Sequence, residues 1–568
     1  MSIIKGDFRI VIFTFLLFIV SLEDAGASNW KISSSVMPLC SFVTPEGFGA
    51  KGDGISDDTE AFLKAICSGK KVKCENIYRL RKSSLPITHE GKLCYPTISN
   101  RVRIYGSGKI LFDFHINVAS TLEVINLSLI STGLEPNGLF SIMEGGQASF
   151  SNVSFDGSLV DKVNGGVASR GNLVVKDCMF FQSDINIIAP EGGFTISGTT
   201  FDANYANDSQ HLSNELIHIQ RCKSGIIIGC SFIHSKQDIV DFYFGAKNVC
   251  FERNVASDNE FTLFEIKAEY RDNGSAQGGN QVYGDHTENI TIKNNVFKVN
   301  HSIAWIGTRS DVRTDKSKED GYYVRNVRIE DNTIDVDGTE KIDLFYIRNV
   351  KGLSIKNNTI TAQNAPLFFV RVMPCEAYET CERVEFANNQ FECLSYVGCY
   401  IEGNISDFFF SKNNVSHKSS ESYLLLQKDT TLVSGEISMI SNVVNSGPQL
   451  RFGTIDRPIK CRILQLNDQS TSFTYLGSTK SLTICNTNEQ IIYLTGIIGT
   501  LKVERCHHPL FISDGAKIFE LFISDSELRE TPSFVSRGEA TLVEKYIVTR
   551  SKYNVLFDNK IRTYESNK

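Results

Sequence analysis

The sequence predicts an all-β fold built as a solenoid of stacked β-coils. A strand-like phrase recurs along the chain from about residue 120, in forms such as "NVCFERNVA", "NITIKNNVF" and "GLSIKNNTI". The phrase alternates apolar and polar residues with period 2, turns at an asparagine and then adds another apolar residue, which is typical of strands and turns. A leucine-rich repeat fits worse, because no repeat carries a helical stretch.

The spacing of the phrase agrees with one coil per repeat. Most spacings lie between 21 and 31 residues, but two consecutive ones are 41 and 37, which predicts extra loops on two neighbouring coils. Long polar loops on adjacent coils can form the wall of a groove. The first apolar positions are Leu122, Ala148, Leu173, Phe194, Gly225, Val249, Ile290, Val327, Leu353, Val384 and Phe408.

The turn five residues after each of these positions favours small polar side chains. Stacked coils would place them on top of one another, so asparagines could form a ladder of amide hydrogen bonds and cysteines could fill the same small inward site. Cys178 and Cys230 are therefore predicted to be structural thiols. The turn residues are Cys178, Thr199, Cys230, Asn254, Asn295, Asn332, Asn358, Asn389 and Asn413.

The first 27 residues have the pattern of a secretory signal. Lys5 and Arg9 precede an apolar run, and Ala25-Gly26-Ala27 follows it. We therefore expect cleavage near Ala27 and a secreted or periplasmic protein. The apolar run is shorter than the roughly 20 residues that a membrane span needs. With a net charge of -7, the composition gives no reason to expect nucleic acid or stable membrane insertion.

An exported protein meets an oxidising environment, so some of the 15 cysteines can form disulfides. The plausible bridges involve cysteines that lie close together in the sequence, and the odd total leaves at least one free thiol. These cysteines are Cys375 and Cys381 in one loop, Cys393 and Cys399 in the next, and the early group Cys40, Cys67, Cys74 and Cys94.

The stretch "FGAKGDGISDDTEAF", Phe48 to Phe62, resembles the amino-terminal signature of the pectate-lyase superfamily, which includes polygalacturonases and phage tailspikes. The resemblance implies a right-handed parallel β-helix with an N-terminal capping helix. We expect a signal peptide over 1–27, an N-terminal segment with the cap over 28–110, the main parallel β-helix over 111–430, and irregular C-terminal coils with a cap over 431–568. Asp57 and Asp58 precede "TEAFLKAI" and are predicted to cap that helix, not to act on substrate.

The same resemblance implies a carbohydrate-directed activity, but not that of a standard polygalacturonase. The coils lack the Asp-Asp, Gly-His-Gly and Arg-Ile-Lys motifs of those enzymes, and Asn-Thr-Asp is absent. The site is therefore predicted from the coils themselves.

A stripe of acids, aromatic residues and cations is predicted on the outer face of one strand in successive coils. Keeping apolar residues inward turns the opposite parity outward, next to the long loops. The predicted catalytic residues are Asp238, Asp241, Glu265 and Lys267. The predicted substrate-binding residues are His218, Tyr243, Arg271, Trp305, Arg309, Arg348 and Arg371, and Phe369 is a further outward aromatic residue.

Three functions use this stripe differently. Two neighbouring carboxylates repel each other, which raises the pKa of one of them and suits glycoside hydrolysis, here of an acidic polysaccharide. Tailspike glycosidases similarly place acids on adjacent coils. A polysaccharide lyase would use Lys267 and Arg271 for β-elimination, with calcium held by Asp241, Glu265 and Glu269. A non-catalytic polysaccharide-binding or surface protein also fits. No cofactor or metal is expected for the hydrolase, and a homotrimer is compatible with the tailspike resemblance.

Overall fold

The chain folds into a parallel β-helix, seen here in a computed structural model. Residues Val43–Lys568 form one compact unit. The structure describes residues 42–563 apart from 89–90, 134–137, 161–163, 204–214, 244, 269, 273–281, 309–322, 339–341, 363–367, 374–379, 394–397, 418–424, 428–434, 441, 446–449, 454–457, 468–471, 530, 553–555 and 559–560. Among these residues no helix is both long and apolar enough to cross a bilayer.

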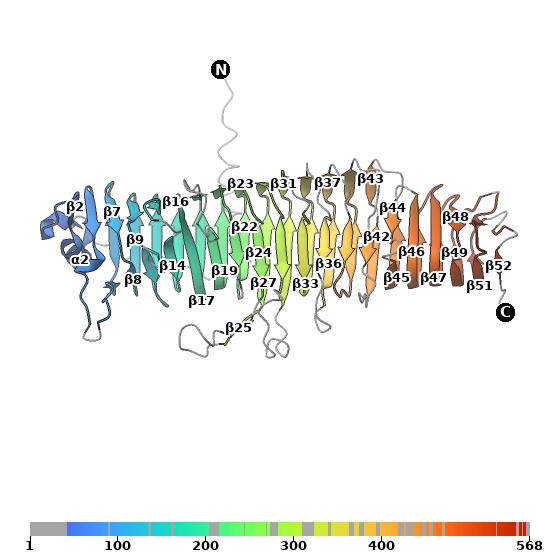
Figure 1. Ribbon diagram of the computed structural model, residues 1–568, viewed down its shortest axis with the longest axis horizontal. Coiled ribbons are helices and arrows are strands. Elements are labelled where there is room, and N and C mark those ends of the chain that lie inside the picture. The colour runs from blue at the N-terminus through green and yellow to red at the C-terminus, as the bar shows by residue number, and fades with distance from the viewer. Residues whose placement is uncertain are drawn as a thin grey trace, which may run out of the picture. The chain divides into compact units, whose positions relative to one another are not determined.

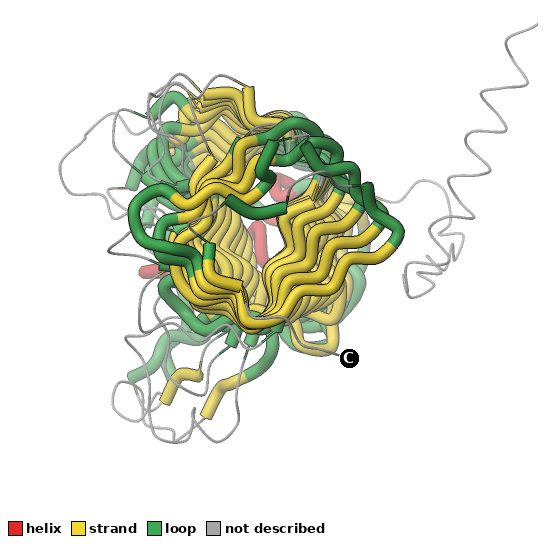
Figure 2. The backbone as a smooth tube through the Cα atoms, turned by 90° about the vertical axis from the view of Figure 1, so that its right-hand side faces the viewer, coloured by secondary structure: helices red, strands yellow, loops and turns green. Residues whose placement is uncertain are grey.

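Each central coil contributes one strand to each of three parallel sheets, so strands of successive coils lie side by side (Figure 1). The view along the stack shows these strands superimposed in layers around the interior (Figure 2). The first sheet contains β5 Thr97–Ile98, β8 Ile116–Val118, β11 Phe140–Ile142, β14 Asn164–Ser169, β17 Ser183–Ser197, β19 Ile217–Ile228, β21 Val240–Phe242, β24 Phe264–Lys267, β29 Ala304–Gly307, β32 Phe345–Arg348, β35 Val370–Val372, β38 Cys399–Ile401, β41 Leu425–Gln427, β44 Leu450–Phe452, β46 Phe473–Cys485, β47 Ile491–Glu504, β48 Leu510–Ser513 and β50 Phe534–Ser536.

The second sheet is continuous with the first through β17, β19, β46 and β47, each of which runs through the bend between the two. Its other strands are β1 Phe42–Val43, β3 Lys71–Lys73, β6 Val102–Tyr105, β9 Thr121–Ile125, β12 Gln147–Ser151, β15 Asn172–Lys176, β22 Lys247–Glu252, β27 Thr287–Lys293, β30 Val324–Glu330, β33 Val350–Lys356, β36 Glu382–Ala387, β39 Phe408–Ser411, β42 Glu436–Ile440, β45 Ile459–Asn467, β49 Lys517–Ser524, β51 Leu542–Thr549 and β52 Arg562–Thr563.

The third sheet contains 15 short strands and lies beyond the asparagine turns. A separate antiparallel hairpin joins β25 Tyr270–Asp272 to β26 Val282–Gly284. The strands of the third sheet are β2 Asp53–Asp57, β4 Ile77–Leu80, β7 Lys109–Phe112, β10 Ser128–Ser131, β13 Ser154–Asp156, β16 Met179–Phe181, β18 Thr200–Asp202, β20 Ser231–Ile233, β23 Val255–Asn259, β28 Val296–Val299, β31 Thr333–Val336, β34 Thr359–Ala362, β37 Gln390–Cys393, β40 Asn414–His417 and β43 Val443–Asn445.

The predicted repeat register is confirmed at all eleven apolar positions, from Leu122 to Phe408, which pair with one another through the second sheet. Gly225 is the member of this row without a side chain. A Cβ atom there would lie 2.1 Å from the ring of Phe194 on the preceding coil. The glycine therefore leaves room for that aromatic ring in the core.

The asparagine ladder is also confirmed. In each step the side-chain amide of one asparagine donates to the Oδ1 of the next, over Asn254, Asn295, Asn332, Asn358, Asn389, Asn413 and Asn442. The same Oδ1 atoms accept a backbone N–H, as in Asn332 to Asn358 at 3.0 Å. Cys230 begins this ladder as predicted, because its backbone N–H donates to Asn254 Oδ1.

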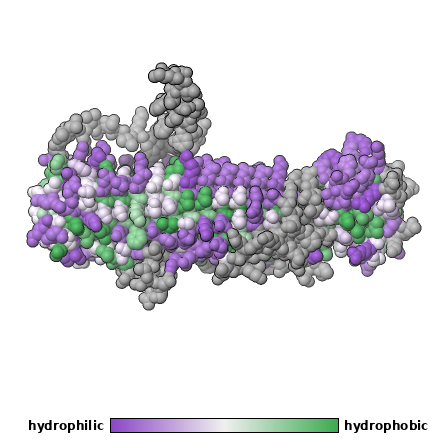
Figure 3. Space-filling view, turned by 90° about the horizontal axis from the view of Figure 1, so that it is seen from above, coloured by the Kyte–Doolittle hydropathy of each residue, from purple (hydrophilic) through white to green (hydrophobic). Residues whose placement is uncertain are grey.

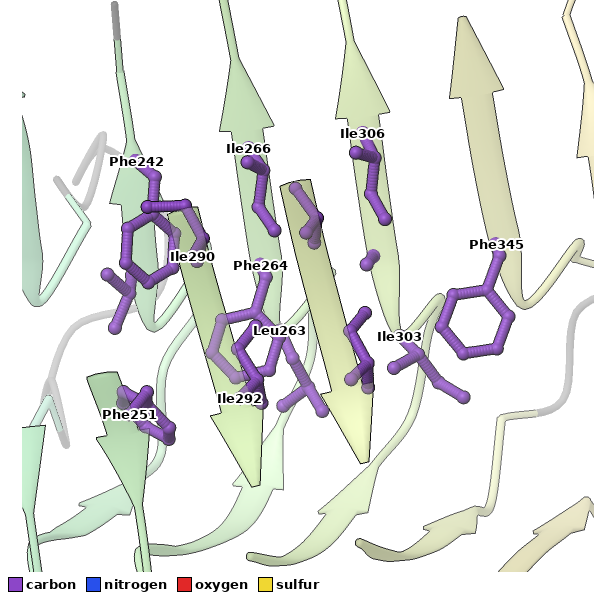
Figure 4. Close-up of a cluster of buried hydrophobic side chains, with 14 of the residues drawn as sticks. Phe242, Phe251, Leu263, Phe264, Ile266, Ile290, Ile292, Ile303, Ile306 and Phe345 are labelled. Carbon is purple, nitrogen blue, oxygen red and sulfur yellow. The ribbon is translucent and has the colours of Figure 1, made fainter. Parts of the chain in front are cut away.

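Apolar side chains of the first and second sheets fill the interior between the coils. Phe242, Phe264 and Ile306 come from the first sheet, and Phe251 and Ile290 face them from the second (Figure 4). All of these side chains are fully buried. The outward-facing residues of β21, β24 and β29 therefore stand on rigid, packed strands.

The predicted N-terminal helix is α2, Thr59–Cys67, which packs against the 3-10 helix η1, Pro45–Phe48, with a second 3-10 helix η2 at Lys82–Ser84. Asp58 occupies the N-cap position, but its carboxylate accepts the backbone N–H of Lys51 at 2.7 Å instead of capping the helix. Asp57 Oδ1 accepts from Thr59 N at 3.0 Å. The predicted cap by the Asp58 side chain is therefore wrong, although Asp58 stands at the N-cap position, and Asp57 bonds the backbone at the first helical residue.

The predicted boundaries at 110 and 430 mark no break in the stacking. Strand β7 runs through the first of them, and β41 on one side of the second pairs with β44 on the other. The pairing continues to β52. The predicted signal peptide over 1–27 lies outside the described residues.

The early cysteine group does not form the bridges that the sequence suggested. Cys67, Cys74 and Cys94 are free thiols. Cys74 is buried, and burial raises the pKa of its thiol. Cys40 and Cys375, and the side chain of Cys393, lie outside the described residues.

Candidate active site

The predicted outward stripe is a single register row on the first sheet. His218 pairs with Asp241, Asp241 with Glu265, and Glu265 with Trp305, and the row then continues to Tyr346 and Arg371. Neighbouring strands lie about 4.8 Å apart, so each side chain in the row has its neighbours within reach. The structure therefore brings six predicted outward residues together in the expected order.

Asp241, Glu265 and Lys267 form a buried charged cluster. The Lys267 ammonium lies 3.2 Å from Asp241 Oδ2 and also forms an ion pair with Glu265. The side chains of Asp241 and Lys267 are only 2% and 3% exposed, whereas that of Glu265 is 10% exposed. Of the three, Glu265 thus presents the most surface to a ligand.

His218 and Glu215 extend this cluster toward solvent. His218 Nδ1 lies 3.3 Å from Asp241 Oδ2 and 3.9 Å from Glu215 Oε2. Burial by itself would lower the pKa of His218, but contact with Asp241 and the charge of Glu215 outweigh it and raise that pKa. Burial would likewise raise the pKa of Asp241, but His218 and Lys267 outweigh it and keep that carboxyl ionised.

Asp238 lies at the turn before β21 and behaves in the opposite way. Its side chain is buried, and its Oδ1 has no hydrogen-bond partner among the described residues. Burial, followed by the charges of Glu265 and Asp241, raises the pKa of Asp238 to about 9. The site therefore combines a carboxylic acid that holds its proton at neutral pH with an ionised neighbour.

Several predicted contact residues are not on the surface. Tyr243 is 4% exposed and its ring lies 5.0 Å from the Lys267 ammonium, so it is not an open platform for a sugar. Arg348 is also buried. Phe369 is a core residue that stacks on Phe391 with ring centroids 4.0 Å apart, so its predicted outward orientation is wrong. Side-chain parity failed there because Phe369 precedes the strand that aligns Arg371 with Tyr346.

Trp305 and Tyr346 are partly exposed and continue the row beyond the charged cluster. They stand on β29 and β32, and their inward neighbours Ile306 and Phe345 belong to the core (Figure 4). Flat rings in this position suit stacking on the apolar face of a sugar ring. The space-filling view of one face shows a band of hydrophilic residues that runs along the long axis of the stack, across successive coils, beside a more hydrophobic band (Figure 3).

A second polar cluster surrounds Arg371. Its guanidinium pairs with Glu402 and lies 3.3 Å from Asp343 Oδ2, and it stands 5.8 Å from the ring of Tyr400. Asp343 and Glu402 were not among the residues predicted from the sequence. A signal for Asp343 was present, because it lies two residues before the inward Phe345, as Asp238 lies two residues before the inward Val240.

Other predicted residues cannot be placed. Arg309 and Glu269 lie outside the described residues, as do residues 273–281 of the first long loop and 309–322 of the second. Arg271 belongs to the hairpin strand β25, where its backbone pairs with Tyr283, but its side chain lies outside the described part.

A metal site would draw on Glu215, His218 and Asp241, whose ligand atoms lie within 4.8 Å of one another. This set differs from the calcium ligands predicted for a lyase, Asp241, Glu265 and Glu269, of which Glu269 lies outside the described residues, and by itself it suits calcium poorly. Calcium takes six to eight oxygen ligands, whereas this set offers one nitrogen and two carboxylates. The Lys267 ammonium, which lies 3.2 Å from Asp241, would also repel a cation.

No protein-family model and no curated protein matches the sequence. Among solved structures, the chain is similar to the catalytic unit of a GH87 α-1,3-glucanase from Streptomyces thermodiastaticus, with 12% identity over 73% of this chain and 70% of that one and a TM-score of 0.36. A tailspike protein of E. coli bacteriophage HK620 is 13% identical over 93% of this chain and 84% of that one, with a TM-score of 0.35. The Streptococcus pneumoniae surface adhesin PfbA is 12% identical over 93% of this chain and 100% of that one, with a TM-score of 0.27. Likenesses this distant carry no argument about activity.

Proposed function

We propose that this chain is an exported polysaccharide hydrolase that cleaves glycosidic bonds with paired carboxylates on the outer face of its first sheet. One arrangement carries the proposal: His218 Nδ1 and the Lys267 ammonium lie 3.3 and 3.2 Å from Asp241 Oδ2, while Asp238 is buried in the same site. Burial and the charges of Glu265 and Asp241 raise the pKa of Asp238, whereas His218 and Lys267 outweigh the effect of burial on Asp241 and lower its pKa. Glycoside hydrolysis needs a protonated acid for the leaving oxygen, which Asp238 would supply, and a carboxylate for the opposite role, which the neighbouring charged cluster would supply.

The environment of each group suggests its role. Asp238 is the general acid, because burial and neighbouring charges hold its proton. Glu265 is the nucleophile or base, because it is the most exposed member of the buried cluster. Lys267 and His218 position the carboxylates and keep Asp241 ionised. Trp305 and Tyr346 supply stacking surfaces for the bound sugar chain.

The contacts of Lys267 weigh against the lyase alternative. A lyase base must be a neutral amine, whereas the ion pairs with Asp241 and Glu265 require the protonated ammonium. One observation favours a binding protein instead, since Asp238 and Asp241 are almost completely buried. A ligand would then touch only the partly exposed row of His218, Glu265, Trp305 and Tyr346.

The test is incubation with a panel of neutral and acidic polysaccharides while reducing ends and the absorbance of unsaturated uronate are followed. Reducing ends without that absorbance support hydrolysis, the absorbance would show a lyase, and binding without either product would show a binding protein. We expect Asp238→Asn, Asp241→Asn and Glu265→Gln to abolish cleavage with the fold retained. Glu385→Gln is the matched control, because it removes a partly exposed ion pair with Lys356 on the second sheet, away from the proposed site.

Localisation and assembly form part of the same proposal. The chain is expected to be secreted or periplasmic on the basis of residues 1–27. A homotrimer is tested by light scattering of the purified protein, where the mass of one 63.4 kDa chain would exclude it.

A further inference from the structure

The cluster around Arg371 is built from parts similar to those of the acid cluster, which comprises Asp238, Asp241, Glu265 and Lys267. Asp343 has the same place in its coil as Asp238. Asp238 lies two residues before Val240 and Asp343 two residues before Phe345, and both of these core residues belong to the register row Val240, Phe264, Ala304 and Phe345. Asp343 is 1% exposed, and its Oδ1 has no hydrogen-bond partner among the described residues. The polar arrangement around Asp238 thus recurs three coils further along the same face.

Unlike the buried acid cluster, this one reaches the surface through its cation. The side chain of Arg371 is 31% exposed, and Asp343 and Glu402 hold its guanidinium from two sides. Tyr400 packs near it and contacts Phe368, with ring centroids 5.0 Å apart. The result is a fixed guanidinium fork on an aromatic base, which is a pre-organised hydrogen-bonding surface.

The charges of this cluster do not suit an acidic ligand. Glu402 and Asp343 both lie against the Arg371 guanidinium, so carboxyl groups of the cluster itself balance its charge. Lys267, the cation of the acid cluster, is likewise balanced by Asp241 and Glu265. Neither cation leaves net positive charge for a uronate. Sugar hydroxyls, which both donate and accept hydrogen bonds, match a guanidinium flanked by carboxylates.

Trp305 and Tyr346 connect the two clusters. They occupy the two coils between Glu265 and Arg371 in the same row. Three strand spacings separate Glu265 from Arg371, which is roughly 14 Å at the backbone. A sugar chain lying along the row would therefore meet the acid cluster, two aromatic rings and the Arg371 cluster in turn.

We propose that Arg371, held by Asp343 and Glu402 and backed by Tyr400, is a distal subsite for uncharged sugars of the polysaccharide that the acid cluster cleaves. The proposal rests on the proposed hydrolase function, and it replaces the acidic substrate that the sequence suggested with a neutral one. Only chains long enough to cross the two aromatic coils reach both clusters.

The test uses Glu402→Gln, which removes one of the two carboxylates that pair with Arg371 and nearly preserves the side-chain shape. Probes are oligosaccharides prepared from a glucan, a galactan, a mannan and polygalacturonate, as short di- and trisaccharides and as long hexa- to octasaccharides. Binding is measured by calorimetry, and cleavage by the release of reducing ends. Glu385→Gln is the matched control, and thermal unfolding checks that both variants are folded.

We expect the unaltered protein to bind a long neutral oligosaccharide more tightly than any galacturonate. Glu402→Gln should weaken binding of the long neutral chain roughly tenfold, leave short chains unchanged and strengthen binding of long galacturonates, because Arg371 then keeps only one of its two carboxyl partners, Asp343. A purely structural pair would not produce this exchange of ligand class. Arg371→Lys, which keeps the charge but loses the fork, should weaken only the long neutral chains.

The proposal is overturned if the unaltered protein prefers galacturonates, if it binds no neutral oligosaccharide, or if Glu402→Gln changes short and long chains equally. Binding with the expected length dependence but without cleavage would leave the subsite standing and reject the hydrolase. The two failures are therefore distinguishable.

Discussion

The asparagine ladder and the carboxylate row are both stacks of polar side chains at one register position, but their hydrogen bonding differs. At the ladder, Asn358 Nδ2 donates to Asn389 Oδ1 at 3.0 Å and to the Ile329 carbonyl at 2.9 Å, and its Oδ1 accepts from Asn332. The carboxylate row is Asp241 and Glu265 on neighbouring strands, with Asp238 at the turn before the first of them. Here the Oδ1 atoms of Asp238 and Asp241 are buried without a partner among the described residues.

The difference follows from the chemistry of the two groups. An amide carries both a donor and an acceptor, so identical amides can bond to one another along a stack. An ionised carboxylate only accepts, so stacked carboxylates repel each other unless a cation or a proton separates them. Lys267 supplies the cation and Asp238 keeps the proton. The ladder thus serves stability, whereas the carboxylate row is held in a state suited to proton transfer.

Removing the cation should have the largest effect. We expect Lys267→Met to lower the free energy of unfolding by about 3–5 kcal/mol, because it leaves Asp241 and Glu265 buried without their counter-ion. Urea unfolding followed by circular dichroism measures the change. The exposed pair of Lys351 with Glu382 provides the control, and Lys351→Met should cost less than about 1 kcal/mol. Equal losses in the two variants would contradict the buried cluster.

Placing a carboxylate in the ladder should have the next largest effect. We expect Asn358→Asp to cost about 2–3 kcal/mol, because an acceptor would then face the acceptors Asn389 Oδ1 and Ile329 O. The control is Asn326→Asp in an exposed amide row, where Asn326 donates to Asn289 at 3.1 Å and water can replace the lost bond. A shift of the urea midpoint as small as that of the control would mean that the buried ladder does not contribute to stability.

The two stacks were not equally predictable from the sequence. The ladder follows from the recurrence of Asn at one offset, because the stacking rule alone brings those amides together. The order His218, Asp241, Glu265 and Trp305 followed from strand parity in the same way. Strand parity predicts whether a side chain points outward but not whether neighbouring side chains bury it. The burial of Tyr243 and the ion pairs of Lys267 with two carboxylates were therefore not predicted. Glu402 was missed because it follows its strand, and no repeat fixes that position.

The proton held by Asp238 should give stability a specific pH dependence. Its pKa rises from an ordinary value near 3.8 to about 9 on folding, so between those pH values the folded state binds a proton that the unfolded chain has lost. Stability contributed by this group is therefore full below the unfolded pKa and decreases as the pH rises toward 9, by at most about 1.4 kcal/mol per pH unit.

We expect Asp238→Asn to remove this part of the slope, so that the variant is inactive but loses less stability than the unaltered protein between neutral and alkaline pH. Urea midpoints across that range measure the slope. Asp337→Asn is the control, because the Asp337 carboxylate is exposed and its Oδ2 lies 3.6 Å from the Lys298 ammonium, so the slope should stay unchanged. An identical slope in Asp238→Asn would show that Asp238 is ionised at neutral pH, and the proposed general acid would be lost.

The smallest effect is expected in the exposed amide row that resembles the ladder without its burial. Asn289 donates to Asn248 at 2.9 Å and has a φ of 58°, a left-handed conformation that glycine adopts without strain. We expect Asn289→Gly to change the free energy of unfolding by less than about 0.5 kcal/mol, because water replaces the side-chain bonds and the relief of backbone strain offsets the rest. A loss comparable to that of Asn358→Asp would mean that stacking itself stabilises the coils, whereas the expected result assigns the stabilisation to burial of the amides.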